Sequence, residues 1–175
     1  MAGQGKNLAL PRIVTDTERA EGAPMRIYLV IMDETDEALV ALRFAARRAA
    51  KTGGTVHLLA LVPQQPFSAF AGVQATIEEE ARARAETLVT AAAGNIVADS
   101  GPMPHIEVRM GDGIKVIRDY LAENPEVAAL VLGAAREGGP GPLVTHFAGT
   151  GMGQLPCPLY VIPGGLDDEA LERLS

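Results

Sequence analysis

The chain has 175 residues, of which 47% are hydrophobic and 21% charged, a composition typical of one globular domain with tails. Its net charge of −7 argues against a nucleic-acid partner, because phosphate neutralisation requires clustered Lys and Arg side chains. No apolar run is long enough to span a membrane, and the single cysteine, Cys157, cannot form an internal disulfide. We therefore expect a cytoplasmic protein with no nucleic acid and no membrane among its partners.

Residues 1–24 differ in composition from the rest of the chain. They mix glycine, proline and acidic residues without a sustained hydrophobic period, and they lack the continuous apolar core of a secretory signal. We expect a flexible N-terminal extension over 1–24, a folded domain over 25–165, and a short C-terminal helix or tail over 166–175. Met25 opens the folded region and is an alternative to Met1 as the native start.

From Met25 onward, apolar segments alternate with amphipathic ones. Strands are predicted over residues 26–32, 55–62, 105–110, 128–133 and 158–163. The first helix is predicted to end at Gly53 and Gly54. Its apolar face carries Leu39, Leu42, Ala46 and Ala49. This alternation predicts an α/β fold, with an open, doubly wound, mainly parallel sheet of five strands and helices on both faces.

Two further helices have start signals in the sequence. The segment Thr76-Ile77-Glu78-Glu79 predicts a capping box, in which the Thr hydroxyl and the Glu carboxylate satisfy free N–H groups, and the helix is expected to stop near Gly94. Its inward residues are predicted to be Ile77, Ala81, Leu88 and Ala92. Asp112 is predicted to cap the next helix. The inner face of that helix carries Ile114, Ile117 and Leu121.

The fourth predicted strand runs into a glycine-rich loop. Residues 128–133 form an uninterrupted apolar run, and residues 138–142 read Gly-Gly-Pro-Gly-Pro. In parallel sheets, ligands bind beyond the carboxyl ends of the strands, where glycines let backbone N–H groups approach an anion. The loop is therefore the first place to look for a functional site, and a simple flexible turn is the alternative interpretation.

The order of several short motifs resembles the universal stress protein family. The motifs are Asp33 after the first strand, Met110-Gly111-Asp112 after the third, Val-Leu-Gly ending the fourth, and Pro-Cys-Pro-Leu-Tyr-Val-Ile over 156–162. The resemblance covers about residues 25–165. It implies the strand order 3-2-1-4-5, a homodimer and, in one branch of the family, ATP bound at the carboxyl edge of the sheet.

The ATP-binding branch resembles a pattern of Gly, two residues, Gly, nine residues, and Gly followed by Ser or Thr. Gly139 and Gly149-Thr150 match the second half of this pattern. The first half does not match, because Arg136 stands three positions before Gly139 and Gly133 three positions before Arg136. The helix expected next also contains three glycines, each of which costs about 1 kcal/mol in a helix interior.

Under the binding hypothesis, the cofactor is ATP or AMP, with Mg²⁺ held only through the nucleotide. Asp33 would accept a hydrogen bond from the adenine or the ribose. Three residues would contact the base and ribose: Val62, Met110 and Gly111. The phosphates would be surrounded by Gly133, Gly139, Gly149 and Thr150, with Arg136 as counter-charge. The structural alternatives are a helix N-terminal carboxylate for Asp33, core packing for Val62 and Met110, and an exposed loop position for Arg136.

No catalytic or metal-binding constellation is apparent. The three histidines, His57, His105 and His146, do not have metal-ligand spacing. Neither a Gly-x-Ser-x-Gly nucleophile motif nor a phosphate loop with a lysine is present, so we expect no catalytic residue, no protein-held metal and at most slow ATP hydrolysis. An enzyme of the same architecture, such as a flavodoxin-like carrier or an adenylate-transferring enzyme, is the hypothesis with least support.

Two functional hypotheses stay open: a nucleotide-binding stress or signalling module, and a nucleotide-free dimeric module that acts through an unknown protein partner. Both predict a homodimer through residues 158–163, because this apolar strand lies at the sheet edge in the family's strand order and a bare apolar edge invites pairing. The competing prediction is that a helix over 166–174 covers the edge within a monomer. Its apolar face would carry Leu166, Ala170, Leu171 and Leu174.

Overall fold

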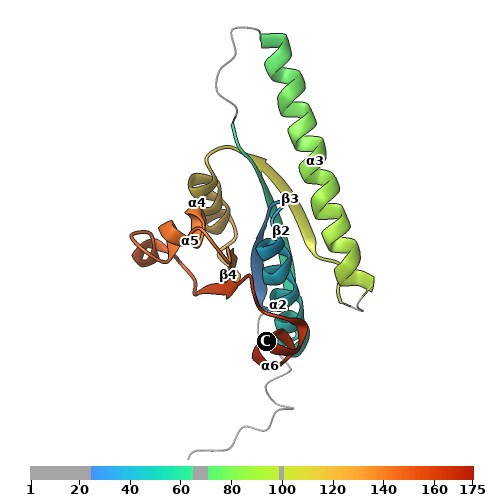
Figure 1. The fold of residues 1–175 in the computed structure, drawn as a ribbon, viewed down its shortest axis with the longest axis vertical. Helices are drawn as coiled ribbons and strands as arrows, with labels where there is room; N and C mark the ends of the chain where they lie inside the picture. The colour runs from blue at the N-terminus through green and yellow to red at the C-terminus, as the bar shows by residue number, and fades with distance from the viewer. Residues whose placement is uncertain (1–24, 65–70, 99–100) are drawn as a thin grey trace, which may run out of the picture.

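The computed structural model describes residues 25–64, 71–98 and 101–175, and the predicted extension over 1–24 lies outside them. Within the described residues, five strands form one sheet in the order β3-β2-β1-β4-β5, and every neighbouring pair is parallel (Figure 1). The strands are β1 (Ile27–Met32), β2 (Thr55–Val62), β3 (His105–Met110), β4 (Val127–Ala134) and β5 (Leu159–Pro163). The predicted fold class and strand order are confirmed.

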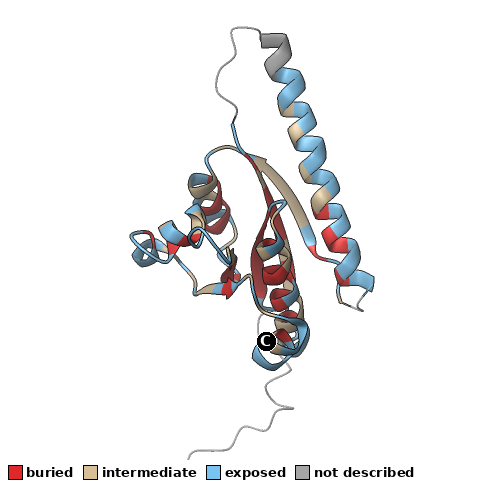
Figure 2. Cartoon of the chain, viewed as in Figure 1, coloured by how far each residue is buried: buried red, intermediate tan, exposed pale blue. Residues whose placement is uncertain are grey.

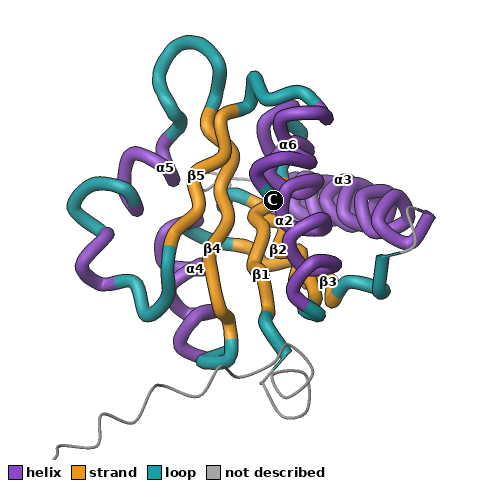
Figure 3. The backbone as a smooth tube through the Cα atoms, turned by 90° about the horizontal axis from the view of Figure 1, so that it is seen from below, coloured by secondary structure: helices purple, strands orange, loops and turns teal. Residues whose placement is uncertain are grey.

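Helices cover both faces of this sheet (Figure 3). One face is covered by α2 (Asp36–Thr52), α3 (Ala71–Ala98) and α6 (Asp168–Leu174). The other face is covered by α4 (Gly113–Glu123) and the short α5 (Pro142–Phe147). A 3₁₀ turn, η1 (Met152–Gln154), precedes β5.

The central strand β1 is buried along its whole length. Tyr28, Val30 and Met32 point into the core beneath α2, and the alternate residues point into the core beneath α4 and α5. A strand buried on both faces needs apolar side chains at every position, which explains its uninterrupted apolar sequence. Figure 2 shows buried residues concentrated in the central strands and α2.

Helix α2 follows the prediction closely. Its N-cap is Thr35, whose side chain accepts a hydrogen bond from the Ala38 N–H. Gly53 ends the helix in a left-handed conformation with φ of 63°, which a residue with a Cβ adopts only at a cost. On the predicted apolar face, Leu42 and Ala49 are buried.

Helix α3 differs from the prediction at both ends. It begins at Ala71, so the predicted capping box at 76–79 is wrong because Thr76 lies inside the helix. The first part of α3 extends beyond the sheet, and Ile77, predicted to face inward, is 41% exposed (Figures 1 and 2). The helix also continues past Gly94, because Ile96 in its last turn is buried against the core and offsets the glycine's cost of about 1 kcal/mol.

Two other caps are set by aspartates. Asp112 accepts a hydrogen bond from the Lys115 N–H at 2.9 Å and caps α4, as predicted. Asp167 accepts one from the Ala170 N–H at 2.8 Å and caps α6. Helix α6 packs on α2, where Leu171 is fully buried.

Candidate functional site

A small pocket of about 160 Å³ lies where β1 and β4 end, at the carboxyl edge of the sheet. The loop after β4 and the start of α5 close its other side. Its lining residues are Ile31, Asp33, Thr35, Glu37, Ala38, Leu132, Gly133, Pro140, Gly141, Pro142, Leu143 and Val144. Two of the predicted site residues, Asp33 and Gly133, are therefore brought together.

Asp33 is held in place by the turn that leads into α2. Its Oδ1 accepts hydrogen bonds from the backbone N–H of Thr35, at 3.0 Å, and from the Thr35 hydroxyl. Because Thr35 is the residue that caps α2, Asp33 supports the helix start indirectly. The side chain is exposed, so the rest of the carboxylate stays accessible to a ligand.

Gly133 also has a packing role. A Cβ at this position would lie 2.2 Å from the backbone oxygen of Glu37, in the first turn of α2. A side chain on residue 133 would therefore push α2 away from β4. Because residue 133 is glycine, the beginning of α2 packs directly against the end of β4, and both line the pocket.

The loop between β4 and α5 depends on left-handed backbone conformations. Gly138, Gly139 and Gly141 have φ values of 76°, 103° and 93°, and a Cβ on any of them would meet no atom within 4 Å. Space therefore permits side chains at these positions, but the backbone conformation disfavours them. Pro142 at the start of α5 then fixes a helical φ without losing a needed N–H.

Four predicted phosphate-site residues lie outside the lining of this pocket: Arg136, Gly139, Gly149 and Thr150, of which Gly139 directly precedes the lining residue Pro140. Gly149 and Thr150 follow the carboxyl end of α5, and a helix of its length spans about 9 Å. Arg136 is exposed, and a Cβ on Gly165 would lie 3.4 Å from its Nε, so its guanidinium group lies over the turn between β5 and α6.

The residues predicted to contact the base lie further along the same edge. Val62 and Met110 are register partners at the ends of β2 and β3, and the Gly111 N–H donates to the Val62 oxygen at 3.0 Å. Val62 is buried, whereas Met110 is 37% exposed. Gly111 has a φ of 144°, so the chain turns sharply after Met110.

The pocket is acidic. Among its lining residues, Asp33 and Glu37 are charged and no lysine or arginine is present. The sequence pointed to the loop over 138–142, but residues 140–142 were not among the predicted site residues, and Thr35 and Glu37 were not predicted at all. The proline directly after Gly141 is a signal for a helix start, and it could have placed α5 beside the loop.

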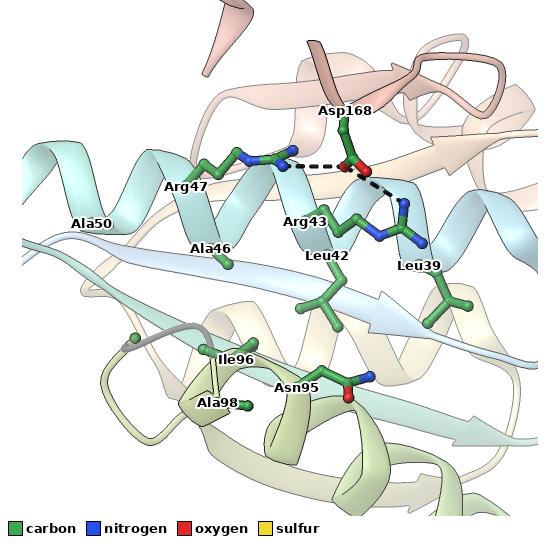
Figure 4. A pocket seen from close by; sticks show the side chains of 11 residues that line it. Leu39, Leu42, Arg43, Ala46, Arg47, Ala50, Asn95, Ile96, Ala98 and Asp168 are labelled. Carbon is green, nitrogen blue, oxygen red and sulfur yellow. Dashed lines mark hydrogen bonds and ion pairs between the residues drawn. The ribbon is translucent and has the colours of Figure 1, made fainter. Parts of the chain in front are cut away.

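A larger groove, of about 640 Å³, lies between α2, the end of α3 and the start of α6 (Figure 4). Leu39, Leu42 and Ala46 contribute apolar surface, and Arg43 and Arg47 pair with Asp168 at 3.7 and 3.1 Å. The groove lies away from the strand ends and has no loop of left-handed glycines. We therefore assign the candidate ligand site to the pocket at the strand ends, although its volume is smaller than that of the groove.

Other chemistry has little support in the described residues. No group of three or more His, Cys, Asp or Glu side chains there has the arrangement of a metal site. Burial raises the pKa of the Cys157 thiol, an effect that a hydrogen bond with the Leu130 backbone opposes. Cys157 is therefore poorly suited to act as a nucleophile. Among the helices described, none combines the length and apolarity needed to cross a membrane.

The parallel sheet and the glycine-rich loop at its carboxyl edge define a doubly wound α/β protein. The model of the Universal stress protein family matches residues 25–163, so the chain belongs to that family. A comparison with curated proteins found no match.

Solved structures support the same fold. Universal stress protein UspA from Lactobacillus plantarum has 19% sequence identity and a TM-score of 0.61, over 81% of this chain and 99% of that one. A universal stress protein family member from Burkholderia pseudomallei has 16% identity and a TM-score of 0.61, over 81% and 98%. A universal stress protein in complex with cAMP has 13% identity and a TM-score of 0.50, over 80% and 98%.

Proposed function

We propose that this universal stress protein binds an adenine nucleotide, ATP or AMP, at the carboxyl edge of its sheet and acts as a dimer in stress response or signalling. The observation that carries the proposal is the pocket below the glycine-rich loop, with Asp33 on its wall. The cAMP complex of a protein with the same fold is consistent with an adenine ligand.

The proposed ligand lies along the edge, across several strand ends. The candidate residues occupy the ends of β3, β2, β1 and β4, which are neighbours in that order and about 5 Å apart. Met110 and Val62 would contact the base, Asp33 the base or ribose, and the loop after β4 the phosphates. The pocket of about 160 Å³ would hold the phosphate end only, since whole-ligand pockets are usually about 300–1,000 Å³.

Magnesium is expected to accompany the phosphates. The pocket has two carboxylates and no cationic side chain among its lining residues, so a bare triphosphate would meet unfavourable charge. Mg²⁺ favours oxygen ligands and is often bound through phosphates together with one or two carboxylates. The ion would therefore enter with the nucleotide, and the loop N–H groups would contact the remaining phosphate oxygens.

The experiment is to denature the purified protein and identify any nucleotide that it releases, and then to measure the melting temperature with ATP or AMP. A ligand at about 100 times its Kd stabilises the fold by about 2.7 kcal/mol. The rise should disappear in Gly139→Val, at a left-handed position of the loop beside the lining residue Pro140, and persist in Gly153→Val, which belongs to neither this loop nor the pocket lining. No released nucleotide and no rise at millimolar concentration, with or without Mg²⁺, would reject nucleotide binding.

A nucleotide-free interaction module is the second candidate. It is favoured by the position of Arg136, whose side chain lies over the turn at Gly165 instead of lining the pocket. Under this hypothesis the acidic pocket holds no phosphate, and the dimer presents a surface to an unknown protein partner. The same release and melting experiments distinguish the two candidates.

The proposed dimer joins two copies of β5. The two edges of the sheet differ in chemistry: β3 carries His105, Glu107 and Arg109, whereas β5 reads Leu-Tyr-Val-Ile-Pro. Charged side chains on an edge strand discourage pairing with another chain, and an apolar edge favours it. We therefore place the two-fold axis beside β5.

A further inference from the structure

A second group of titratable side chains lies outside the nucleotide region, where β2 and β3 meet α4. His57 and His105 are register partners on neighbouring strands, and their ring centroids are 4.8 Å apart. Alternation along both strands places these rings on the face covered by α4. Nothing in the proposed nucleotide site uses them.

The group connects three elements through contacts of its side chains. His57 Nδ1 lies 2.8 Å from the hydroxyl oxygen of Tyr120 on α4. The Arg109 guanidinium lies over the Tyr120 ring, 4.9 Å from its centroid, and donates to Glu107 and to Glu123 on α4. One network thus attaches the edge strand β3 to α4 across β2.

The direction of the hydrogen bond between His57 Nδ1 and the Tyr120 hydroxyl depends on whether Nδ1 carries a proton. Tyr120 is 1% exposed, and burial raises its pKa to about 12, so its hydroxyl keeps its proton and donates to Nδ1 when that atom is unprotonated. A proton on Nδ1 would make Nδ1 the donor to the hydroxyl oxygen and leave the buried hydroxyl proton without this acceptor, which costs free energy. Within the described residues, no other hydrogen-bond acceptor is found for the Tyr120 hydroxyl.

The charges around His57 come from each neighbouring element. Burial lowers its pKa most, and a positive charge on His105 lowers it further, while Glu126 after α4 and Glu107 on β3 raise it. His105 itself has a carboxylate close by, because its Nε2 lies 3.7 Å from Glu107. A proton on His57 therefore places a positive charge on a poorly solvated ring that lies beside the His105 ring.

We propose that His57, His105 and Tyr120 form a proton-sensitive clasp that keeps β3 and α4 together when the His57 ring is neutral and releases them locally when that ring is protonated. The sign follows from proton linkage. In the unfolded chain His57 takes up a proton near pH 6.5, whereas in the folded chain its pKa is lower. The unfolded chain therefore binds more protons in acid, and the stability of the attachment falls as the pH drops below 6.5. The clasp does not depend on nucleotide binding.

The first test follows the histidine rings of the wild-type protein by NMR as the pH is lowered. We expect His57 to titrate below 6.5 and its midpoint to rise in His105→Gln, which removes the neighbouring charge. A wild-type midpoint at or above 6.5, or one unaffected by His105→Gln, would overturn the proposal. This test requires no substitution at His57.

The second test measures amide hydrogen exchange of residues 105–123 between pH 7.5 and 5.0, corrected for the intrinsic pH dependence. Because one ring, His57, must be protonated, opening should accelerate by up to about tenfold per pH unit. His57→Gln, whose amide oxygen still accepts from Tyr120, should lose this acceleration. His146→Gln is the matched control, because His146 contacts Arg118 on another part of α4 and should leave the acceleration unchanged.

Two outcomes of the exchange experiment would contradict the clasp. One is an absence of acceleration in the wild-type protein, and the other is equal acceleration in wild type and His57→Gln. If His57→Gln does not fold, the comparison of wild type with His105→Gln decides, since removal of the charge on β3 must reduce the acceleration.

Discussion

Asp33 illustrates how one side chain can serve both the fold and a ligand. One carboxylate oxygen holds Thr35, which caps α2, and the group also lines the pocket at the strand ends. These two roles have different energetic signatures. A ligand role changes affinity, whereas a capping role changes the free energy of unfolding.

We expect Asp33→Ala to weaken nucleotide binding by about 1–3 kcal/mol, the usual contribution of a hydrogen bond to a charged group. Asp167→Ala is the matched control, because it removes the cap of α6 outside the pocket lining, costs about 0.5–2 kcal/mol of stability and should leave the affinity unchanged. Calorimetric titration of the folded variants measures affinity, and urea unfolding measures stability. Equal affinity in wild type and Asp33→Ala would exclude the ligand role.

The reactivity of Cys157 is a second test at the scale of a residue. Burial raises the pKa of its thiol, so the fraction of reactive thiolate at neutral pH is small. Iodoacetamide should modify the folded protein more slowly than the urea-denatured protein at the same pH. Equal rates would show that the thiol is accessible in the folded protein and that burial does not raise its pKa.

Site residues were harder to predict than the fold, for a physical reason. Asp33 directly follows β1, and Gly133 is the second-last residue of β4, so the sheet fixes where both residues lie. Arg136 and Gly149 belong to irregular segments whose direction is set by turns and by packing of α5. Sequence spacing does not encode that direction, and neither Gly139 nor Gly149, whose spacing matched the pattern, belongs to the pocket lining.

At the scale of elements, the strands and most helix ends could be predicted because buried parallel strands are continuous apolar runs and caps have local signals. Thr55–Val62 and His105–Met110 match their predicted bounds. The start of α3 could not be predicted in this way. Its first turns lie beyond the sheet, where no core requires a periodic apolar face (Figure 1). The capping sequence at Thr76 therefore lies inside the helix and does not mark its start.

The attachment of α6 to α2 should depend on apolar packing more than on charge. Leu171 is fully buried, and a Leu→Ala change at such a site costs about 2–5 kcal/mol. Glu172 pairs with Arg47 and Lys51 at 3.3 and 3.1 Å, but its side chain is 64% exposed, and such pairs contribute about 0–1 kcal/mol each.

Urea unfolding of Leu171→Ala and Glu172→Ala compares these terms directly. We expect the larger loss of stability in Leu171→Ala, and a smaller loss in Glu172→Ala that declines further at high salt because exposed charges are screened. A larger loss in Glu172→Ala would mean that the ion pairs, and not the buried leucine, hold the C-terminal helix.

At the scale of the whole molecule, the two sheet edges predict how copies associate. Helix α6 packs on α2, and Val161 of β5 remains 37% exposed. Tyr160 packs edge-on against Phe44 of α2 with ring centroids 5.7 Å apart, so a change at Tyr160 would also disturb the core. Val161 is therefore the better position at which to test association.

We expect the wild-type protein to sediment as a dimer at micromolar concentration and Val161→Asp to sediment as a soluble monomer. Two copies of β5 would pair antiparallel about a two-fold axis, and a carboxylate on this strand would meet its symmetry mate in a desolvated contact. Val97→Asp is the matched control, because Val97 is 43% exposed on α3, away from β5, and the dimer should persist. The melting temperature of each variant, measured in parallel, separates loss of association from loss of fold. A wild-type monomer, or a Val161→Asp dimer as tight as wild type, would place the interface elsewhere or exclude it.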